Sequence, residues 1–446
     1  MTLPRTNRRS VLKATGTALA GLTLSTSLAG ASEKRRYLVD SKSLRKNADV
    51  EILHDLSAVD LLVVRADEAA LDGAKYAADG RYEPRVPDPA PGRATRVEYP
   101  PEGEDLTAYQ WDKQDQRIPE AHEITRGEGT RVAIIDSGVG AGHPDLQGTV
   151  NHDLSRNFTP DSLGAPGPYG GAHGTHVAGI IAASDENDSG VVGSAPGAEL
   201  VDLRVFSQVD SADFSAWMGD VLAAIVYAAD IGADAANLSL GWTFRFREDG
   251  WGKFWGQAMQ RTATYANRQG TVLTHACGNW GGTLQFDKDQ RDSSEMAGGL
   301  TVAATGPIGF KWGEDGLEEP PYAPAYYTNH GTNAVDLGAP GGNADSDAVG
   351  TGANWHYDFV VNTVAEPNYD ENGEYLGADY GYDWYAGTSM AAPQVAGAVA
   401  LLKSANPRMN ANQLQSTLKR VAEVPDEYEK KYYGSGYLDT YGALTE

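Results

Sequence analysis

An aspartate, a histidine and a serine that could form a nucleophilic triad lie far apart in the chain, at Asp136, His173 and Ser389. A serine hydroxyl is a weak nucleophile, so it needs a neighbouring base, and that base needs a third group to orient it. Asp136 closes an apolar run that predicts a strand, while His173 and Ser389 each lie at the start of a segment that predicts a helix. If these ends meet at one edge of a sheet, the chain holds a complete set of groups for acyl transfer.

Each of these residues also has a plain structural interpretation. An aspartate after a strand commonly caps a turn, a histidine at a helix start is more often structural than catalytic, and a serine before a helix is commonly an N-cap. Together, in the order Asp…His…Ser and with small residues around each, they match one of the unrelated chain orders in which one triad geometry recurs. We therefore predict that the three act as one catalytic unit.

Three short motifs around these residues resemble the signature motifs of the subtilisin-like serine proteases, the subtilase family. They are Ile134-Ile135-Asp136-Ser137-Gly138, His173-Gly174-Thr175-His176-Val177-Ala178-Gly179 and Gly387-Thr388-Ser389-Met390-Ala391-Ala392-Pro393. The resemblance covers roughly residues 106–446 and extends to the secreted, halolysin-like subtilases of haloarchaea.

The resemblance implies a role for each matching residue. Ser389 would attack the scissile carbonyl, His173 would take and return its proton, and Asp136 would hold His173 in the right tautomer. Asn279 would donate its amide to the developing oxyanion, together with the backbone N–H of Ser389. His176 does not match the base position and is expected to pack.

The same resemblance implies a substrate cradle. The segment 237–241 is similar to the edge on which subtilases lay an extended peptide as an added strand, a mode that accepts many sequences. Substrate-binding residues are therefore expected at Ser239, Leu240, Gly241 and Gly278. The neighbouring Cys277 is expected to pack as a small apolar group.

One structural calcium ion is also implied. Asp145 and Asn187 match in position a family site built from one aspartate, one asparagine and several carbonyl groups, and hard oxygen ligands suit Ca²⁺. We expect no organic cofactor. Zinc is unsupported, because His173 and His176 have no third ligand at metal-site spacing.

The fold that must position these residues is predicted to be α/β, with a three-layer parallel sheet and helices on both faces, because strands alternate with helices from Arg131 onward. The expected strands are 132–136, 199–206, 235–240, 271–276 and 299–305, and the expected helices are 174–183, 214–229, 257–268 and 390–404. Three segments interrupt this alternation and are expected to be functional loops or mobile insertions: 242–257, 307–329 and 343–383.

The residues before this unit are of a different kind. Residues 1–31 have a basic start with Arg8-Arg9, a short apolar run and small residues at the end, which predicts a twin-arginine-type export signal. Residues 32–105 predict a small α+β propeptide with strands 50–53, 61–65 and 82–85, a helix 68–78 and a proline-rich linker. By position this leader resembles the inhibitory propeptide of the family.

The net charge of −25 is placed unevenly. Residues 1–105 hold 16 basic and 16 acidic side chains, so all the excess negative charge belongs to residues 106–446. Such a surface favours concentrated salt, although an ordinary acidic surface is the alternative interpretation. It disfavours nucleic acid as a partner, because phosphate binding needs positive charge. With Cys277 as the only cysteine, no intramolecular disulfide can form.

Three rival interpretations fit less well. An α/β-hydrolase esterase needs G-x-S-x-G and the order Ser…Asp…His, but this chain has Ala391 in place of the second glycine. The glycines of 138–142 do not have the spacing of a dinucleotide-binding loop. A catalytically dead binding module would be expected to lose one of the four catalytic positions. We thus predict a secreted, monomeric, salt-requiring endopeptidase that cleaves extended polypeptides, has no membrane anchor in its mature form and is inhibited by its own propeptide.

Overall fold

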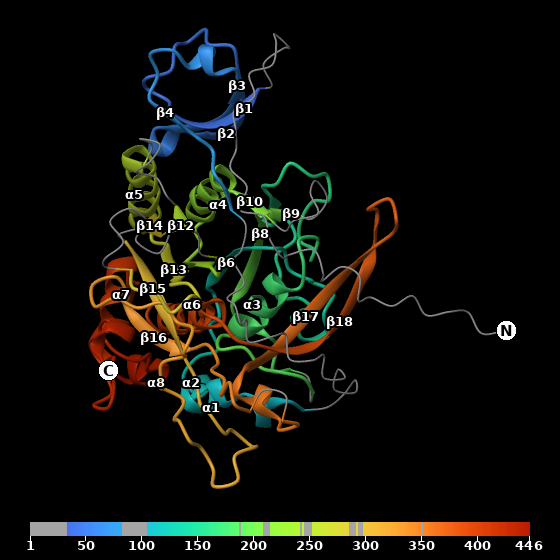
Figure 1. Cartoon of the computed structure of the whole chain (residues 1–446), viewed down its shortest axis with the longest axis vertical. Helices are drawn as coiled ribbons and strands as arrows, with labels where there is room; N and C mark the ends of the chain where they lie inside the picture. The colour runs from blue at the N-terminus through green and yellow to red at the C-terminus, as the bar shows by residue number, and fades with distance from the viewer. Residues whose placement is uncertain are drawn as a thin grey trace, which may run out of the picture.

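The computed structural model describes residues 34–82, 105–186, 189–207, 215–240, 243–244, 252–284, 291–292, 298–348 and 351–446. These residues form a small antiparallel sheet near the N-terminus and a larger α/β body (Figure 1). The predicted export signal, residues 1–31, lies outside them. No described helix is long and apolar enough to cross a membrane.

Seven parallel strands form the centre of the body, in the spatial order β16-β15-β13-β11-β6-β8-β7. Their side chains are buried on both faces, as is typical of a parallel sheet between two helical layers. In chain order the strands are β6 (Arg131–Asp136), β7 (Arg156–Asn157), β8 (Glu199–Arg204), β11 (Ala235–Leu238), β13 (Val272–Ala276), β15 (Gly299–Thr305) and β16 (Leu337–Pro340).

Helices cover both faces of this sheet. One face shares a core with α1 (Trp111–Asp115), α2 (Ile118–His122), α3 (His173–Ala182), α6 (Thr388–Ala405), α7 (Ala411–Val421) and α8 (Thr440–Thr445). The other face packs against α4 (Met218–Asp230) and α5 (Gly252–Gln269). The predicted three-layer α/β fold is confirmed.

Two predicted helices of the body begin elsewhere than expected. The helix expected over 214–229 begins only at Met218, because Ser215–Trp217 form β10, which pairs with β9 (Phe206–Ser207) and β5 (Arg81–Tyr82). The helix expected over 257–268 begins earlier, at Gly252. Strand pairing with a distant segment decides the first case, and local sequence does not reveal it.

The leader is a four-stranded antiparallel sheet in the order β2-β3-β1-β4. The helix predicted over 68–78 is wrong: residues 68–71 form one 3₁₀ turn, Gly73 turns the chain at φ 80°, and the following residues pair with β1. The strand β1 was not predicted. The strands are β1 (Arg35–Asp40), β2 (Val50–Leu56), β3 (Leu61–Ala66) and β4 (Tyr76–Ala78).

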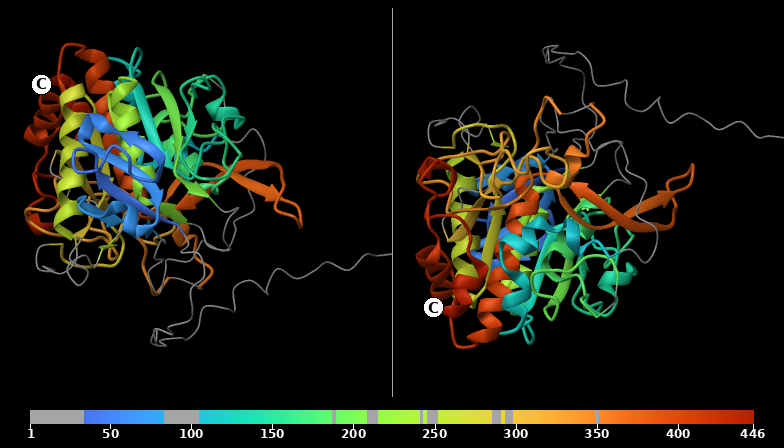
Figure 2. Two further views of the ribbon diagram at one scale, coloured as in Figure 1. Left: turned by 90° about the horizontal axis from the view of Figure 1, so that it is seen from above. Right: turned by 90° about the horizontal axis from the view of Figure 1, so that it is seen from below.

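One face of this leader sheet packs on the outer side of α4 and α5 (Figures 1 and 2). Leu38, Leu61 and Val63 are fully buried and belong to the same core as Val221 and Ile225 of α4. The leader therefore continues the hydrophobic core of the body.

Buried charges join the leader to α4. Arg36 donates to Asp79 at 2.8 Å and also pairs with Asp220 of α4, and all three side chains are at most 8 % exposed. Asp79 in turn accepts the backbone N–H of Gly219 at the start of α4, at 2.8 Å. The nearby imidazole of His54 lies 2.8 Å from the carboxylate of Asp220. Among the described residues, Arg36 is the cation that pairs with both of these buried carboxylates.

The segment 343–383, predicted as an irregular insertion, instead contains a long β-hairpin. Its strands β17 (Val360–Tyr369) and β18 (Tyr375–Tyr385) pair antiparallel, and the hairpin projects from the body (Figures 1 and 2). Its base contacts α3, where Thr363 donates to the carbonyl of Thr175 at 2.8 Å. The structure therefore corrects the loop prediction for most of this segment.

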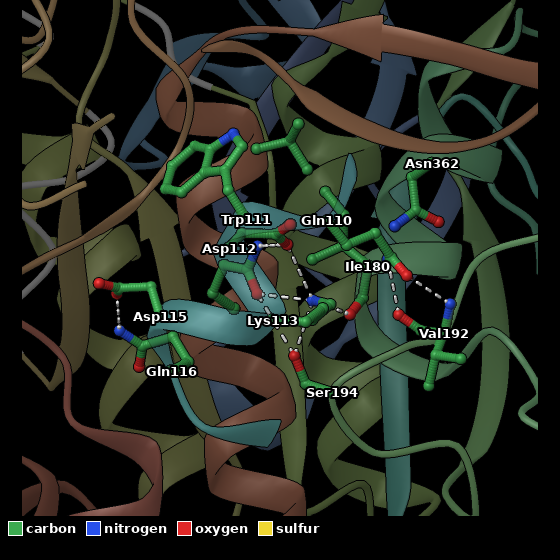
Figure 3. A network of polar contacts seen from close by, with 12 residues as sticks. Gln110, Trp111, Asp112, Lys113, Asp115, Gln116, Ile180, Val192, Ser194 and Asn362 are labelled. Carbon is green, nitrogen blue, oxygen red and sulfur yellow. Dashed lines mark hydrogen bonds and ion pairs between the residues drawn. The ribbon is translucent and has the colours of Figure 1, made fainter. Parts of the chain in front are cut away.

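A second buried network joins α1 to α3 and α6 (Figure 3). The Nζ of Lys113 in α1 donates to the carbonyl of Ile180 in α3 at 3.0 Å, to Ser194 at 2.9 Å and to Gln394 of α6 at 2.7 Å. Asp112 lies 3.2 Å from the same ammonium. This network fixes α1 against two helices, α3 and α6, whose first turns hold His173 and Ser389.

The Arg36 contact generates a prediction about docking of the leader. In a Ser389→Ala background, which removes the predicted nucleophile, Arg36→Met leaves Asp79 and Asp220 buried without the guanidinium that pairs with both. Breaking a buried pair in this way costs about 3–5 kcal/mol. We expect a loss of that size in the free energy of unfolding, measured by urea denaturation.

Arg65→Met is the matched control, because Arg65 lies opposite Arg36 on β3 but pairs with Glu51 through side chains that are 39 % and 54 % exposed. An exposed pair contributes about 0–1 kcal/mol. Equal losses for the two variants would contradict the role given to Arg36.

Candidate active site

Asp136 and His173 meet at the carboxyl end of β6. The Oδ1 atom of Asp136 accepts hydrogen bonds from the ring Nδ1 of His173 at 2.8 Å and from the N–H of Ser137 at 2.7 Å. The aspartate is fully buried, whereas the imidazole side chain is 33 % exposed. A buried carboxylate on Nδ1 fixes the tautomer and leaves Nε2 as the ring nitrogen that can exchange a proton.

The electrostatics of this pair suit a base. Burial lowers the pKa of His173, but the charge of Asp136 and its hydrogen bond raise it by more, so the net shift is upward. The imidazolium form is therefore stabilised relative to a histidine in water, as a group that accepts a proton during a reaction requires.

Ser389 is the second residue of α6 and is half-buried. Its hydroxyl donates to the carbonyl of Ser239 at 3.1 Å, and the hydroxyl of Ser239 donates back to the carbonyl of Ser389 at 2.6 Å. Ser239 is itself held by Asn237 of β11, whose amide donates to it at 2.8 Å. The serine at the start of α6 is thus tied to the end of a central strand.

Asn279 follows β13 and is oriented by the residue before the serine. Its Oδ1 accepts the backbone N–H of Thr388 at 2.9 Å and the Thr388 hydroxyl at 2.8 Å. Because Oδ1 of Asn279 accepts both hydrogen bonds from Thr388, its Nδ2 group points away from Thr388 and can donate a hydrogen bond. Thr388 was not predicted from the sequence, and its position beside the candidate nucleophile was the available signal.

Gly387 marks the place where two donors converge. A Cβ on this glycine would lie 3.4 Å from the Nδ2 of Asn279 and 3.6 Å from the backbone N of Ser389. The absence of a side chain here leaves open the space that both N–H groups border. Two donors around one small space is the geometry that stabilises an oxyanion.

The loop that holds Asn279 is built around a second asparagine. Asn329 donates to the carbonyl of Cys277 at 2.8 Å and accepts the N–H groups of Trp280 at 3.2 Å and Gly282 at 3.1 Å. Gly278 lies inside this loop at φ 100°, and a Cβ there would be only 2.4 Å from the Asn329 amide. Asn329 lies 50 residues beyond Asn279, so only the folded chain reveals this contact.

The remaining predicted residues fall in several places. Ser239 is buried against Ser389 at the start of α6, Leu240 is buried in the core shared with α4 and α5, and Gly241 lies outside the described residues. Cys277 is fully buried, as expected of a packing residue. His176 stacks on Tyr385, with ring centroids 4.4 Å apart, and burial lowers the pKa of His176 to about 3, so it packs as a neutral ring.

Of the two predicted calcium ligands, only Asp145 is described, since Asn187 lies outside the described residues. The carboxylate of Asp145 is buried. It accepts hydrogen bonds from the hydroxyl of Tyr382 at 3.1 Å and from the N–H of Val191 at 3.0 Å. A cation here would share the carboxylate with these two donors. Among the described residues, no three His, Cys, Asp or Glu side chains cluster as a metal site.

Comparison with known proteins identifies the family. The chain matches the model of the subtilase family over residues 127–436. It belongs to this family. The matched region contains Asp136, His173, Asn279 and Ser389, and the chain is a subtilisin-like serine protease.

Curated relatives agree with this assignment. The chain is 29 % identical to thermitase of Thermoactinomyces vulgaris over 78 % of this chain and 99 % of that protein. It is 30 % identical to a thermophilic serine proteinase of a Bacillus strain over 76 % of this chain and 67 % of that protein. Fervidolysin of Fervidobacterium pennivorans is 31 % identical over 72 % of this chain and 41 % of its own length.

Solved structures agree with the fold. The crystal structure of fervidolysin matches with a TM-score of 0.64 and 23 % identity over 94 % of this chain and 62 % of that one. A serine protease of Staphylococcus aureus that processes the epidermin leader peptide matches with a TM-score of 0.68 and 21 % identity, over 93 % of this chain and 98 % of that one. At these identities the structural likeness supports the fold alone.

The geometry around Gly387 generates a prediction for Asn279. Asn279→Ala removes one of the two donors, and loss of one such donor in a protease of this family costs on the order of 10²–10³ in turnover. We expect kcat to fall by about this factor with KM nearly unchanged, measured on a chromogenic peptide. Asn151→Ala is the control, because Asn151 contacts Glu199 at the opposite end of β8. A kcat close to that of the parent enzyme would remove Asn279 from the reaction.

Proposed function

We propose that this subtilase is a secreted endopeptidase that hydrolyses peptide bonds through an acyl-enzyme on Ser389. The observation that carries the proposal is the arrangement at one edge of the sheet. The Asp136–His173 pair prepares a base, and the N–H groups of Asn279 and Ser389 border one space beside the serine. An α/β body that only bound peptides would not need this combination.

The reaction that fits these groups has two halves. The Ser389 hydroxyl leaves the carbonyl of Ser239, gives its proton to Nε2 of His173 and attacks the substrate carbonyl carbon, and the two donors stabilise the resulting oxyanion. His173 then gives its proton to the leaving amine as the C–N bond breaks. Water, deprotonated by the same imidazole, hydrolyses the ester and restores the serine. Asp136 stabilises the imidazolium in both halves.

The proposed substrates are extended polypeptides. Ser239 and Leu240 follow β11 directly, and Ser239 contacts Ser389, so an extended peptide could add to this segment as a further strand. Backbone pairing of this kind would accept many sequences, with Leu240 and Gly278 bordering the substrate side chains. Nucleic acid is not part of the proposal, because the body carries the negative charge of the chain.

The leader is proposed to be an inhibitory propeptide. Its sheet covers α4 and α5, and β5, at its end, pairs with β10 of the body. The two solved structures above match 93 % and 94 % of this chain, a share that residues 106–446 alone cannot supply, so likeness extends into the leader. In this proposal the linker is cut to release a monomeric, mature enzyme. This enzyme would resemble the secreted, halolysin-like subtilases of haloarchaea.

Export by the twin-arginine route is supported by residues 1–31, and a need for salt is supported by the excess of acidic groups in residues 106–446. Calcium, held by Asp145 and Asn187, would tie the loop near residue 185 to the turn at residue 145. It would add stability and take no part in the chemistry.

Ser389→Ala is the decisive variant for the proposed function. Without the hydroxyl no acyl-enzyme forms, and loss of the nucleophile costs about 10⁶ in kcat in a protease of this family. We expect hydrolysis of casein in molar salt to fall to the background rate while the fold, followed by circular dichroism, is retained. Undiminished hydrolysis would refute the assignment. Ser416→Ala serves as a control, because the exposed Ser416 of α7 contacts only the carbonyl of Gln413 in its own helix among the described contacts and leaves the nucleophile in place.

The proposed salt and calcium dependence is tested by the melting temperature of the Ser389→Ala protein. Dilute buffer removes the screening of like charges, and EDTA in molar salt removes calcium. We expect each change to lower the melting temperature by about 5 °C or more, equivalent to ~2 kcal/mol. Restoring salt or calcium should reverse the loss. A melting temperature that is unchanged in dilute buffer argues against halophily. One that is unchanged by EDTA argues against bound calcium.

A further inference from the structure

A second buried carboxylate, that of Asp202, lies on the same face of the sheet as Asp136. Asp202 belongs to β8, which pairs in parallel with β6 so that Ile134 is opposite Asp202 and Asp136 is opposite Arg204. These side chains point toward the layer that contains α3, because Ile134 shares the core of that layer. Asp202 is fully buried, and neither the predicted site nor the proposed reaction uses it.

The carboxylate of Asp202 holds two backbone segments together. Its Oδ2 accepts the N–H of Val139 at 3.0 Å and the N–H of Gly167 at 3.1 Å. Val139 lies in the turn that directly follows Asp136, and Gly167 lies in the loop that leads to His173. The Asp202 side chain thus connects the turn that follows Asp136 to the loop that precedes His173.

The other oxygen makes this arrangement costly. Oδ1 of Asp202 is buried without a hydrogen-bond partner among the described residues. The nearest cation on the same strand, Arg204, makes its ion pair with Asp161 of the loop and stacks on Tyr169 at 5.3 Å. A buried, half-satisfied carboxylate is unfavourable for stability alone, which suggests a role beyond packing.

The charge of Asp202 depends on pH near neutrality. Burial raises its pKa to about 7, against the lowering effects of the two N–H groups and of Arg204, and Asp136 raises it further. The charged or titratable groups that face Asp202 are therefore Asp136 on β6, Arg204 on its own strand and, through these two, His173 and Asp161. Above pH 7 a second negative charge lies behind the Asp136–His173 pair.

We propose that Asp202 is a positioning residue for the Asp136–His173 pair. It fixes the turn after the aspartate relative to the loop before the histidine, and its negative charge adds to that of Asp136 in stabilising the imidazolium. The inference rests on the proposed function, since it concerns how the base of that reaction is prepared. It is separable from it, because it can fail while Ser389 remains essential.

Asp202→Asn tests the charge with little change in shape. The amide oxygen can still accept the two N–H groups, but the negative charge is lost, so the pKa of His173 should fall. We expect the acid limb of the kcat/KM profile to move to lower pH by several tenths of a unit. We also expect Asp202→Ala, which removes both acceptors, to lower kcat about tenfold or more with KM within about twofold.

Asp234→Asn is the matched control. Asp234 accepts the N–H of Arg131 at the opposite end of β6, at 3.1 Å, so it supports the same strand far from His173. This variant should lose a similar amount of stability and keep the parent pH profile. If Asp202→Asn does not fold, Asp202→Glu replaces it as the test variant. Glutamate keeps the negative charge but moves the hydrogen-bond acceptor, so this variant should lower kcat without moving the acid limb of the kcat/KM profile.

The result that overturns the inference is a folded Asp202→Asn enzyme whose kcat/KM and acid limb equal those of the parent. A shift shared by Asp234→Asn would overturn it as well, since the effect would then be general. If Ser389→Ala keeps activity, the proposed function fails first, and that outcome is distinct from both.

Discussion

The buried carboxylate of Asp136 is the constraint on which the rest of the site depends. It lies at the end of a buried strand and must be hydrogen-bonded there, so the turn after β6 and the first turn of α3 have to meet at its Oδ1 atom. This contact explains the small residues of the motifs. A Cβ on Gly174 would lie 2.5 Å from the carbonyl of Gly138, and a Cβ on Gly138 would lie 2.0 Å from the carbonyl of Gly167. Glycine is the residue that allows these backbones to approach so closely.

The two halves of the site are built on different strands. The base half uses β6, β8 and α3, whereas the nucleophile half uses β11, β13 and α6. In the nucleophile half, Thr274 donates to Asn237 at 3.0 Å, Asn237 donates to Ser239, and Ser239 exchanges hydrogen bonds with Ser389. These hydrogen bonds fix the position of Ser389 relative to the central strands β11 and β13. The parallel sheet brings the halves together, because all its carboxyl ends lie at one edge.

Two additions surround this framework. The leader extends the core on the outer side of α4 and α5, and the buried Arg36 makes its docking depend on electrostatics as well as on apolar contact. The hairpin β17–β18 supports α3 from the other direction through His176 and Thr363. Its strand β18 ends at Tyr385, only a few residues before Ser389, so its position constrains the approach of the chain to the nucleophile.

The sequence alone determined the local identities: the strand that ends in Asp136, the helices that begin near His173 and Ser389, and the alternation that predicts a parallel sheet. Short-range hydrophobic period and glycine-rich turns carry that information. The sequence alone led to two wrong predictions, a helix at 68–78 and irregular structure at 343–383. It also did not reveal the roles of Asn329, Thr388 and Asp202. Except for the hairpin in 343–383, each of these is decided by a partner tens of residues away or more, as when β4 pairs with β1 and Asp202 accepts from Val139 and Gly167. Strand pairing and buried hydrogen bonds are long-range interactions, so only the tertiary structure could decide them.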